Sequence, residues 1–164
     1  MIDDHVPDRF YPEFYPRFSY EPTKERFSII KTDDVGEGII SHTTFQPGEI
    51  VFRFAGVLLR EVTLFTLQLK EGNHLHDPFF MGKVLHSCDP NMHCDMDTQT
   101  FTALKEIKPG DFLTMDYETT EEELFRSFEC RCGAPNCKKL IMGKKFRLQH
   151  LQEASILQHA VAGT

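Results

Sequence analysis

The chain has 164 residues, 40% of them hydrophobic, so it can bury one core and is most simply a single domain. Residues 1–129 carry 24 acidic and 12 basic side chains, whereas residues 130–164 carry one acidic and six basic side chains. Because phosphate binding needs clustered Lys and Arg, the acidic body argues against nucleic acid as the main ligand and favours a basic peptide. An imbalance that serves only solubility is the alternative.

The start of the chain shows no secretion signal. Met1–His5 opens acidic, and Arg53 interrupts the best apolar run, Ile50–Leu59. We therefore expect an intracellular protein, cytoplasmic or nuclear, with no membrane association. Five cysteines in such a protein favour metal binding over a disulfide framework, and a disulfide pair is the alternative.

Aromatic residues alternate with prolines near the N-terminus. Six rings lie between Phe10 and Tyr20, and Pro12, Pro16 and Pro22 interrupt them. This pattern blocks a regular helix and predicts an extended arm. Because so many rings are costly to expose, we expect the arm to pack on its own domain; a dimer contact and a wall of the substrate cleft are the alternatives.

From Phe27 onward the pattern is that of short strands bounded by turn formers such as Gln46–Glu49 and Lys108–Asp111. The predicted strands cover residues 27–31, 48–54, 66–69, 101–104 and 112–115. Several short strands in about ninety residues predict a mainly β fold of small packed sheets.

Helical signals are few. Capping-box patterns at Thr119 and Thr120, just before Leu124, predict a short helix. A loose helical apolar pattern over Phe146–Ala160 predicts a C-terminal helix.

Four motifs contain residue types typical of ligand-binding, metal-binding or catalytic sites. In chain order they are Gly36-Glu37-Gly38, the run Leu-His-Ser-Cys-Asp-Pro-Asn at 85–91, Asp116-Tyr117, and Cys-Arg-Cys-Gly-Ala-Pro-Asn-Cys at 130–137. Glycines permit close backbone approach and positive φ. Three cysteines on one compact loop suit structural zinc, which takes four cysteine sulfurs in a tetrahedron.

Together these motifs resemble the core and tail of a SET-domain protein lysine methyltransferase with a cysteine-rich post-SET zinc tail, over about Phe27 to Gly143. The resemblance implies a SET-type fold of small packed sheets with a pseudoknot. It divides the chain into an arm at 1–26, a SET domain at 27–127, a post-SET zinc tail at 128–143 and a C-terminal helix at 144–164.

The resemblance also implies the cofactor, the substrate and the site. The cofactor is S-adenosylmethionine, and the substrate is a lysine in a basic protein or peptide. The implied cofactor-binding residues are Gly36, Glu37, Gly38, Leu85, His86, Tyr117 and Phe128. Tyr117 is the implied catalytic residue and lines the substrate channel with Phe54. The implied ligands of one structural zinc are Cys88, Cys130, Cys132 and Cys137, which leaves Cys94 over.

Two positions depart from the family pattern. Leu85 stands where the family has asparagine, and it cannot supply an amide oxygen to a cofactor ammonium, a contact of roughly 1.5 to 3 kcal/mol. Phe54 stands where many members have a channel tyrosine. The lost hydroxyl would hold fewer waters beside the amine, so higher methylation states become a hypothesis.

Other functions are open at this point. A SET-like, zinc-stabilised binding module with weak or no catalysis is the main alternative, and methylation of a small molecule or a non-lysine group is another. Nucleophilic catalysis by Ser87, or by Cys88 with His86, lacks the glycine-rich elbow of serine hydrolases. Isolated histidines such as His74, His76 and His93 are alternative metal ligands.

Overall fold

The structure is a computed structural model that describes residues 6–162, and the acidic start at residues 1–5 lies outside the described residues. The strands are β1 (Phe27–Lys31), β2 (Glu37–Ser41), β3 (Ile50–Arg53), β4 (Val57–Leu59), β5 (Thr66–Lys70), β6 (Asn73–His76), β7 (Leu85–His86), β8 (Met92–Asp95), β9 (Thr100–Ala103), β10 (Thr114–Met115), β11 (Phe128–Glu129) and β12 (Leu140–Ile141). The helical elements are two 3-10 turns, η1 (Met81–Lys83) and η2 (Tyr117–Thr119), and the helix α1 (Lys144–Ala162). The predicted mainly β fold with few short helices and a C-terminal helix is confirmed.

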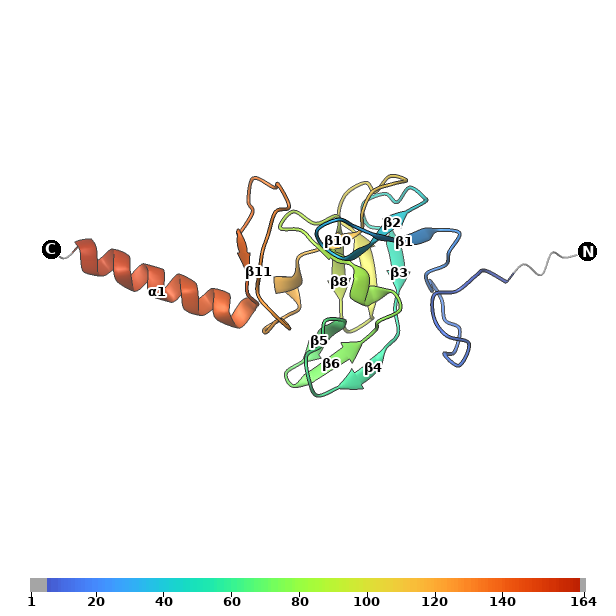
Figure 1. The fold of residues 1–164 in the computed structure, drawn as a ribbon, viewed down its shortest axis with the longest axis horizontal. Coiled ribbons are helices and arrows are strands. Elements are labelled where there is room, and N and C mark those ends of the chain that lie inside the picture. Colours follow the sequence, from blue (N-terminus) through green and yellow to red (C-terminus); the bar gives the residue numbers. More distant parts are fainter. Residues whose placement is uncertain (1–5, 163–164) are drawn as a thin grey trace, which may run out of the picture.

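The strands form small sheets that surround the core (Figure 1). β1 and β2 form an antiparallel hairpin, and two three-stranded sheets have the orders β3-β9-β8 and β4-β6-β5. β7 pairs in parallel with β10, so Leu85 lies opposite Thr114 and His86 opposite Met115. This short pairing brings two of the sequence motifs together, although they are far apart in the chain.

The core consists largely of phenylalanine rings. Phe52 stacks on Phe101 at a ring separation of 4.7 Å and meets Phe80 edge-on at 4.8 Å. Phe27 packs edge-on against both Phe52 and Phe80. Buried rings each remove about 150–250 Å² from water, which lets such short strands hold a compact body.

The N-terminal arm packs on its own domain. The hydroxyl of Tyr11, a residue only 3% exposed, donates a hydrogen bond of 2.7 Å to Oδ2 of Asp77. The carboxylate of Asp77 also accepts backbone N–H groups from residues 79–81. Arg9 pairs with Glu21 inside the arm at 2.6 Å. Buried polar contacts of this kind fix the arm's position on the body.

The helix predicted around Thr119–Glu122 is wrong. η2 ends at Thr119, and the chain continues through turns and bends to residue 127. Gln68 on β5 accounts for the difference: its backbone N–H donates to Glu121 Oε2, and its side-chain amide exchanges two hydrogen bonds with Glu122. These tertiary contacts outweigh the local capping signal.

α1 extends away from the body (Figure 1). None of its residues is buried, and Lys144, Lys145 and Arg147 in its first turn are hydrogen-bonded to the body. Among the residues that the structure covers, no helix has the length and apolar character needed to span a bilayer.

Candidate functional site

The two motifs joined by β7 and β10 form a compact aromatic corner. The His86 ring lies 5.1 Å from Tyr117 and 5.7 Å from Phe128, and the last two rings lie 6.0 Å apart, all edge-on. The Tyr117 hydroxyl donates a 2.6 Å hydrogen bond to the carbonyl of Val84. Burial raises the pKa of Tyr117, and the nearby Glu121 charge raises it further, so the hydroxyl stays protonated.

Both ring nitrogens of His86 have partners within the chain. The backbone N–H of Tyr117 donates to His86 Nδ1 at 3.1 Å, so Nδ1 is an acceptor and the proton of the neutral ring is on Nε2. Nε2 lies 3.4 Å from Cys88 Sγ. Burial lowers the pKa of His86 to about 4, which keeps the ring neutral at pH 7. His86 thus links Tyr117 to the cysteine cluster.

The glycine motif reaches this corner through Leu85. A Cβ added at Gly38 would lie 2.8 Å from Leu85 Cδ1 and 3.0 Å from the Phe112 ring, so a larger residue there would displace Leu85 or Phe112. Gly36 has φ of +77°, and a Cβ there would meet open space. The side chain of Glu37 contacts Lys83. Gly38 thus packs on Leu85, the residue before His86 in the aromatic corner.

Phe54 lies deeper than the aromatic corner. It is 2% exposed and packs against Phe52 and Phe101 at 6.5 and 5.5 Å. Tyr117 packs on the same core cluster. Phe54 and Tyr117 thus both belong to, or pack against, the same hydrophobic core cluster.

The four predicted zinc ligands meet at one point. The Sγ atoms of Cys88, Cys130, Cys132 and Cys137 all lie within 4.8 Å of one another, and Cys88 and Cys130 are 3.9 Å apart. Tetrahedral zinc with Zn–S bonds of about 2.3 Å holds its sulfurs about 3.8 Å apart, so the cluster has the size and chemistry of a four-cysteine zinc site.

Hydrogen bonds from the tail also hold Cys88 in this cluster. The backbone N–H of Lys138 donates to Cys88 Sγ at 3.3 Å, and the Asn136 amide donates to the carbonyl of Cys88 at 2.9 Å. Burial opposes ionisation of Cys132, but hydrogen bonds from the backbone, the first from Ala134, outweigh it and lower its pKa to about 6. A thiolate is the form that binds metal.

The remaining candidates lie elsewhere. Cys94 is buried, its Sγ donates to Met96 Sδ at 3.4 Å, and burial raises its pKa, as for an inert thiol. His74, His76 and His93 are not members of the described metal-binding cluster.

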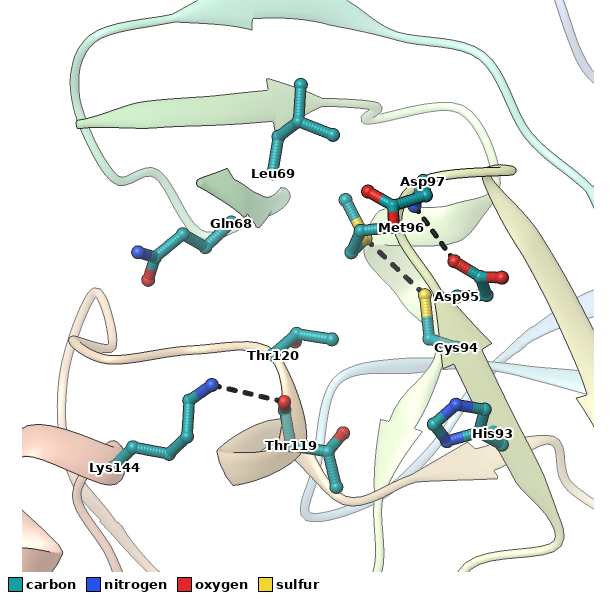
Figure 2. Close-up of a pocket in the computed structure, with 10 residues that line it drawn as sticks. All are labelled: Gln68, Leu69, His93, Cys94, Asp95, Met96, Asp97, Thr119, Thr120 and Lys144. Carbon is teal, nitrogen blue, oxygen red and sulfur yellow. Dashed lines mark hydrogen bonds between the residues drawn. The ribbon is translucent and has the colours of Figure 1, made fainter. Parts of the chain in front are cut away.

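A pocket of about 270 Å³ is lined by Thr119 and Thr120, which follow Tyr117 in the chain (Figure 2). Thr119 and Thr120 line one side and Asp95 and Asp97 another, and Figure 2 shows the Lys144 ammonium hydrogen-bonded to the carbonyl of Thr119. Its lining thus carries two carboxylates, Asp95 and Asp97, and one ammonium group, Lys144.

Two buried carboxylates close to Tyr117 in the chain are not among the residues predicted from the sequence. Glu118 is 5% exposed and Glu121 is 2% exposed. The capping-box patterns of the sequence involve the neighbouring Glu122 and Glu123, and no sequence pattern singled out Glu118 or Glu121. Their partners, Arg147 and Gln68, are distant in the chain.

Comparisons with known proteins agree with this geometry. A family model described as SET domain matches residues 36–118, just over half of the chain. Human histone-lysine N-methyltransferase EHMT1 is 29% identical over 140 residues, which cover 70% of this chain and 11% of that protein. Methyltransferase flvH of Aspergillus flavus is 36% identical over 74 residues, or 44% of this chain and 39% of that protein.

Solved structures show the same fold. One match is a crystal structure of KRYPTONITE in complex with mCHG DNA and SAH. The aligned region covers 76% of this chain and 30% of the KRYPTONITE chain, with a TM-score of 0.58 and 22% sequence identity. A second match is a crystal structure of KRYPTONITE with mCHH DNA, H3(1–15) peptide and SAH. The aligned region covers 70% of this chain and 29% of the KRYPTONITE chain, with a TM-score of 0.55 and 23% sequence identity.

The chain spans less than half of the length of these relatives. The matched segment contains the glycine motif, the His86 motif and Tyr117, which the structure gathers into one corner beside a four-cysteine cluster. The chain belongs to the SET-domain family.

Proposed function

We propose that this chain is an S-adenosylmethionine-dependent protein lysine N-methyltransferase. The observation that carries the proposal is the aromatic corner of His86, Tyr117 and Phe128, in which the Tyr117 hydroxyl is bonded to the carbonyl of Val84. Leu85, the residue before His86, packs on Gly38 of the glycine motif. Relatives named histone-lysine N-methyltransferases, EHMT1 among them, support the reaction class. The SAH named in the KRYPTONITE complexes supports the cofactor, because SAH is what remains of S-adenosylmethionine after methyl donation.

The residues of the corner would bind and orient a lysine amine. A lysine with a pKa of about 10.4 costs roughly 4 to 5 kcal/mol to deprotonate at pH 7. The apolar surroundings of Tyr117 disfavour the ammonium form and so lower that cost. Because the Tyr117 hydroxyl donates its proton to Val84, its oxygen would be left as an acceptor for an N–H of the amine.

S-adenosylmethionine would supply the electrophilic methyl group. Its contacts would be the backbone around the open side of Gly36, the main chain at His86 and the Phe128 ring, since both nitrogens of His86 already have partners. The four cysteines would hold one structural zinc, which would order the tail beside the corner.

We further propose a basic segment around the substrate lysine. The pocket lined by Thr119 and Thr120 carries Asp95 and Asp97 against one lysine, Lys144, and the body of the chain is acidic. One KRYPTONITE complex contains an H3(1–15) peptide. A protein substrate of this kind is consistent with a location in the nucleus or cytoplasm.

We also propose that a dimer, if formed through the N-terminal arm, uses the ring of Phe14, which is 82% exposed.

A SET-like binding module is the second candidate, and Leu85 favours it. The Leu85 side chain packs on Gly38, where the family's asparagine would offer an amide oxygen. Weak cofactor binding would leave a zinc-stabilised fold that binds peptides without methylating them.

Calorimetry followed by mass spectrometry separates the two. The zinc-loaded chain is titrated with S-adenosylmethionine and then incubated with it and a mixture of lysine-rich and acidic peptides. We expect measurable binding and mass gains in multiples of one methyl group on basic peptides. Absence of cofactor binding would favour the binding module.

A further inference from the structure

The residue that follows Tyr117 is a buried, fully paired carboxylate. Glu118 is 5% exposed, and Arg147 donates to it with Nε at 2.8 Å and Nη2 at 3.0 Å, one bond to each oxygen. The backbone N–H of Met142 adds a 3.4 Å contact, and Lys138 Nζ lies 3.7 Å away. Such a fork fixes direction as well as distance.

The partners of Glu118 come from the C-terminal part of the chain. Arg147 belongs to the start of α1, a helix without a buried residue, and its guanidinium also contacts the carbonyl of Leu140. Lys138 lies in the cysteine tail and donates to Asp116 Oδ2 at 2.7 Å. Asp116 and Glu118, the residues on either side of Tyr117, are therefore both held by the tail and the helix.

This attachment bears directly on Tyr117. Asp116 caps η2 by accepting the N–H of Glu118 at 3.0 Å, and between these residues Tyr117 makes its bonds to His86 and Val84. A buried carboxylate that loses its partner either moves to water or takes up a proton. Either change would pull on the turn that carries the Tyr117 ring.

On the basis of the proposed function, we propose that Arg147 and Glu118 are positioning residues that set the placement of Tyr117 from the start of α1. The start of α1 then holds η2, the turn that carries Tyr117, in place through the bond between Arg147 and Glu118. The exposed remainder of α1 takes no part in the reaction.

The test compares two ion pairs in the same helical turn. Arg147→Met keeps the aliphatic stem and removes the fork, whereas Lys145→Met removes the exposed pair with Glu123 at 3.0 Å. Because a displacement of about 1 Å at a reacting group can cost about 100-fold in rate, we expect kcat to fall by up to that factor in Arg147→Met. We expect KM and cofactor affinity to change much less, Lys145→Met to match the parent, and Arg147→Lys to recover part of the loss.

Hydrogen exchange gives a readout that needs no activity. The amide of Tyr117 donates to His86, so we expect it to exchange faster in Arg147→Met and at the parent rate in Lys145→Met. Parental turnover in Arg147→Met, or an unchanged Tyr117 amide, would overturn the proposal. If the parent methylates no peptide, the proposed function fails and the exchange comparison alone decides the positioning role.

A variant that does not fold is replaced by the double variant Glu118→Gln with Arg147→Met, which removes both charges. Low turnover in the folded double variant supports the proposal, and parental turnover overturns it.

Discussion

Glu121 should make the stability of the protein depend on pH near neutrality. Its side chain is 2% exposed and accepts the backbone N–H of Gln68 at 2.7 Å. Burial raises its pKa from 4.5 to about 7, against the lowering effects of the Gln68 hydrogen bond and the Lys144 charge. Cys94 and Tyr117, whose pKa values the Glu121 charge raises, are neutral at pH 7 because burial also raises those pKa values.

The sign follows from the direction of the shift. A carboxyl group whose pKa is higher in the folded protein than in the unfolded chain favours folding when protonated. Its contribution to the free energy of unfolding is complete below pH 4.5 and is lost as the pH rises through about 7. Each pKa unit corresponds to about 1.4 kcal/mol, so the full loss is about 3 kcal/mol.

Glu121→Gln should remove this dependence, because the glutamine amide oxygen can still accept the Gln68 N–H and carries no charge. Between pH 5 and pH 8, we expect the free energy of unfolding of the variant to rise relative to that of the parent by about 2 to 3 kcal/mol. Denaturant unfolding at both pH values with saturating zinc measures the difference. Glu106→Gln, an exposed change, is the control. An equal difference at pH 5 and pH 8 would refute the reasoning.

Three further outcomes are expected. Elemental analysis should find one zinc per chain, and Cys132→Ser or Cys137→Ser should release it and increase proteolysis of the tail; a metal-free chain that folds in the presence of chelator would contradict the site. Leu85→Asn should tighten S-adenosylmethionine binding by restoring an amide beside Gly38, and unchanged affinity in calorimetry would show that the lost amide is not limiting. Phe54→Tyr should shift the products toward fewer methyl groups by mass spectrometry, and an unchanged product ratio would remove Phe54 from the channel.

Local patterns predicted those parts of the molecule whose structure is decided locally. β1 spans Phe27–Lys31 as expected, because turn formers and apolar residues fix its ends. The cysteine spacing predicted three members of the metal cluster, and the family resemblance supplied Cys88. The helical pattern over Phe146–Ala160 predicted α1, which begins two residues earlier, at Lys144.

Elements that depend on distant partners could not be predicted in this way. β6 reads Asn-His-Leu-His, with one apolar residue, and it is a strand because β4 and β5 pair with it on both sides. The turns after η2 depend on Gln68, which is more than fifty residues away. The pairing of Glu118 with Arg147 spans 29 residues and leaves no periodic signal in the sequence. These contacts surround the candidate site, where tertiary structure decides the geometry.

The central claim is that the Tyr117 hydroxyl serves methyl transfer to a lysine amine. Tyr117→Phe keeps the ring contacts with His86 and Phe128 and removes the bond to Val84. The direct measurement is turnover on a basic peptide by mass spectrometry, together with cofactor affinity by calorimetry. We predict a large fall in kcat with little change in cofactor affinity, because the contact acts mainly in the transition state. Full turnover in Tyr117→Phe on a peptide that the parent methylates would contradict the account.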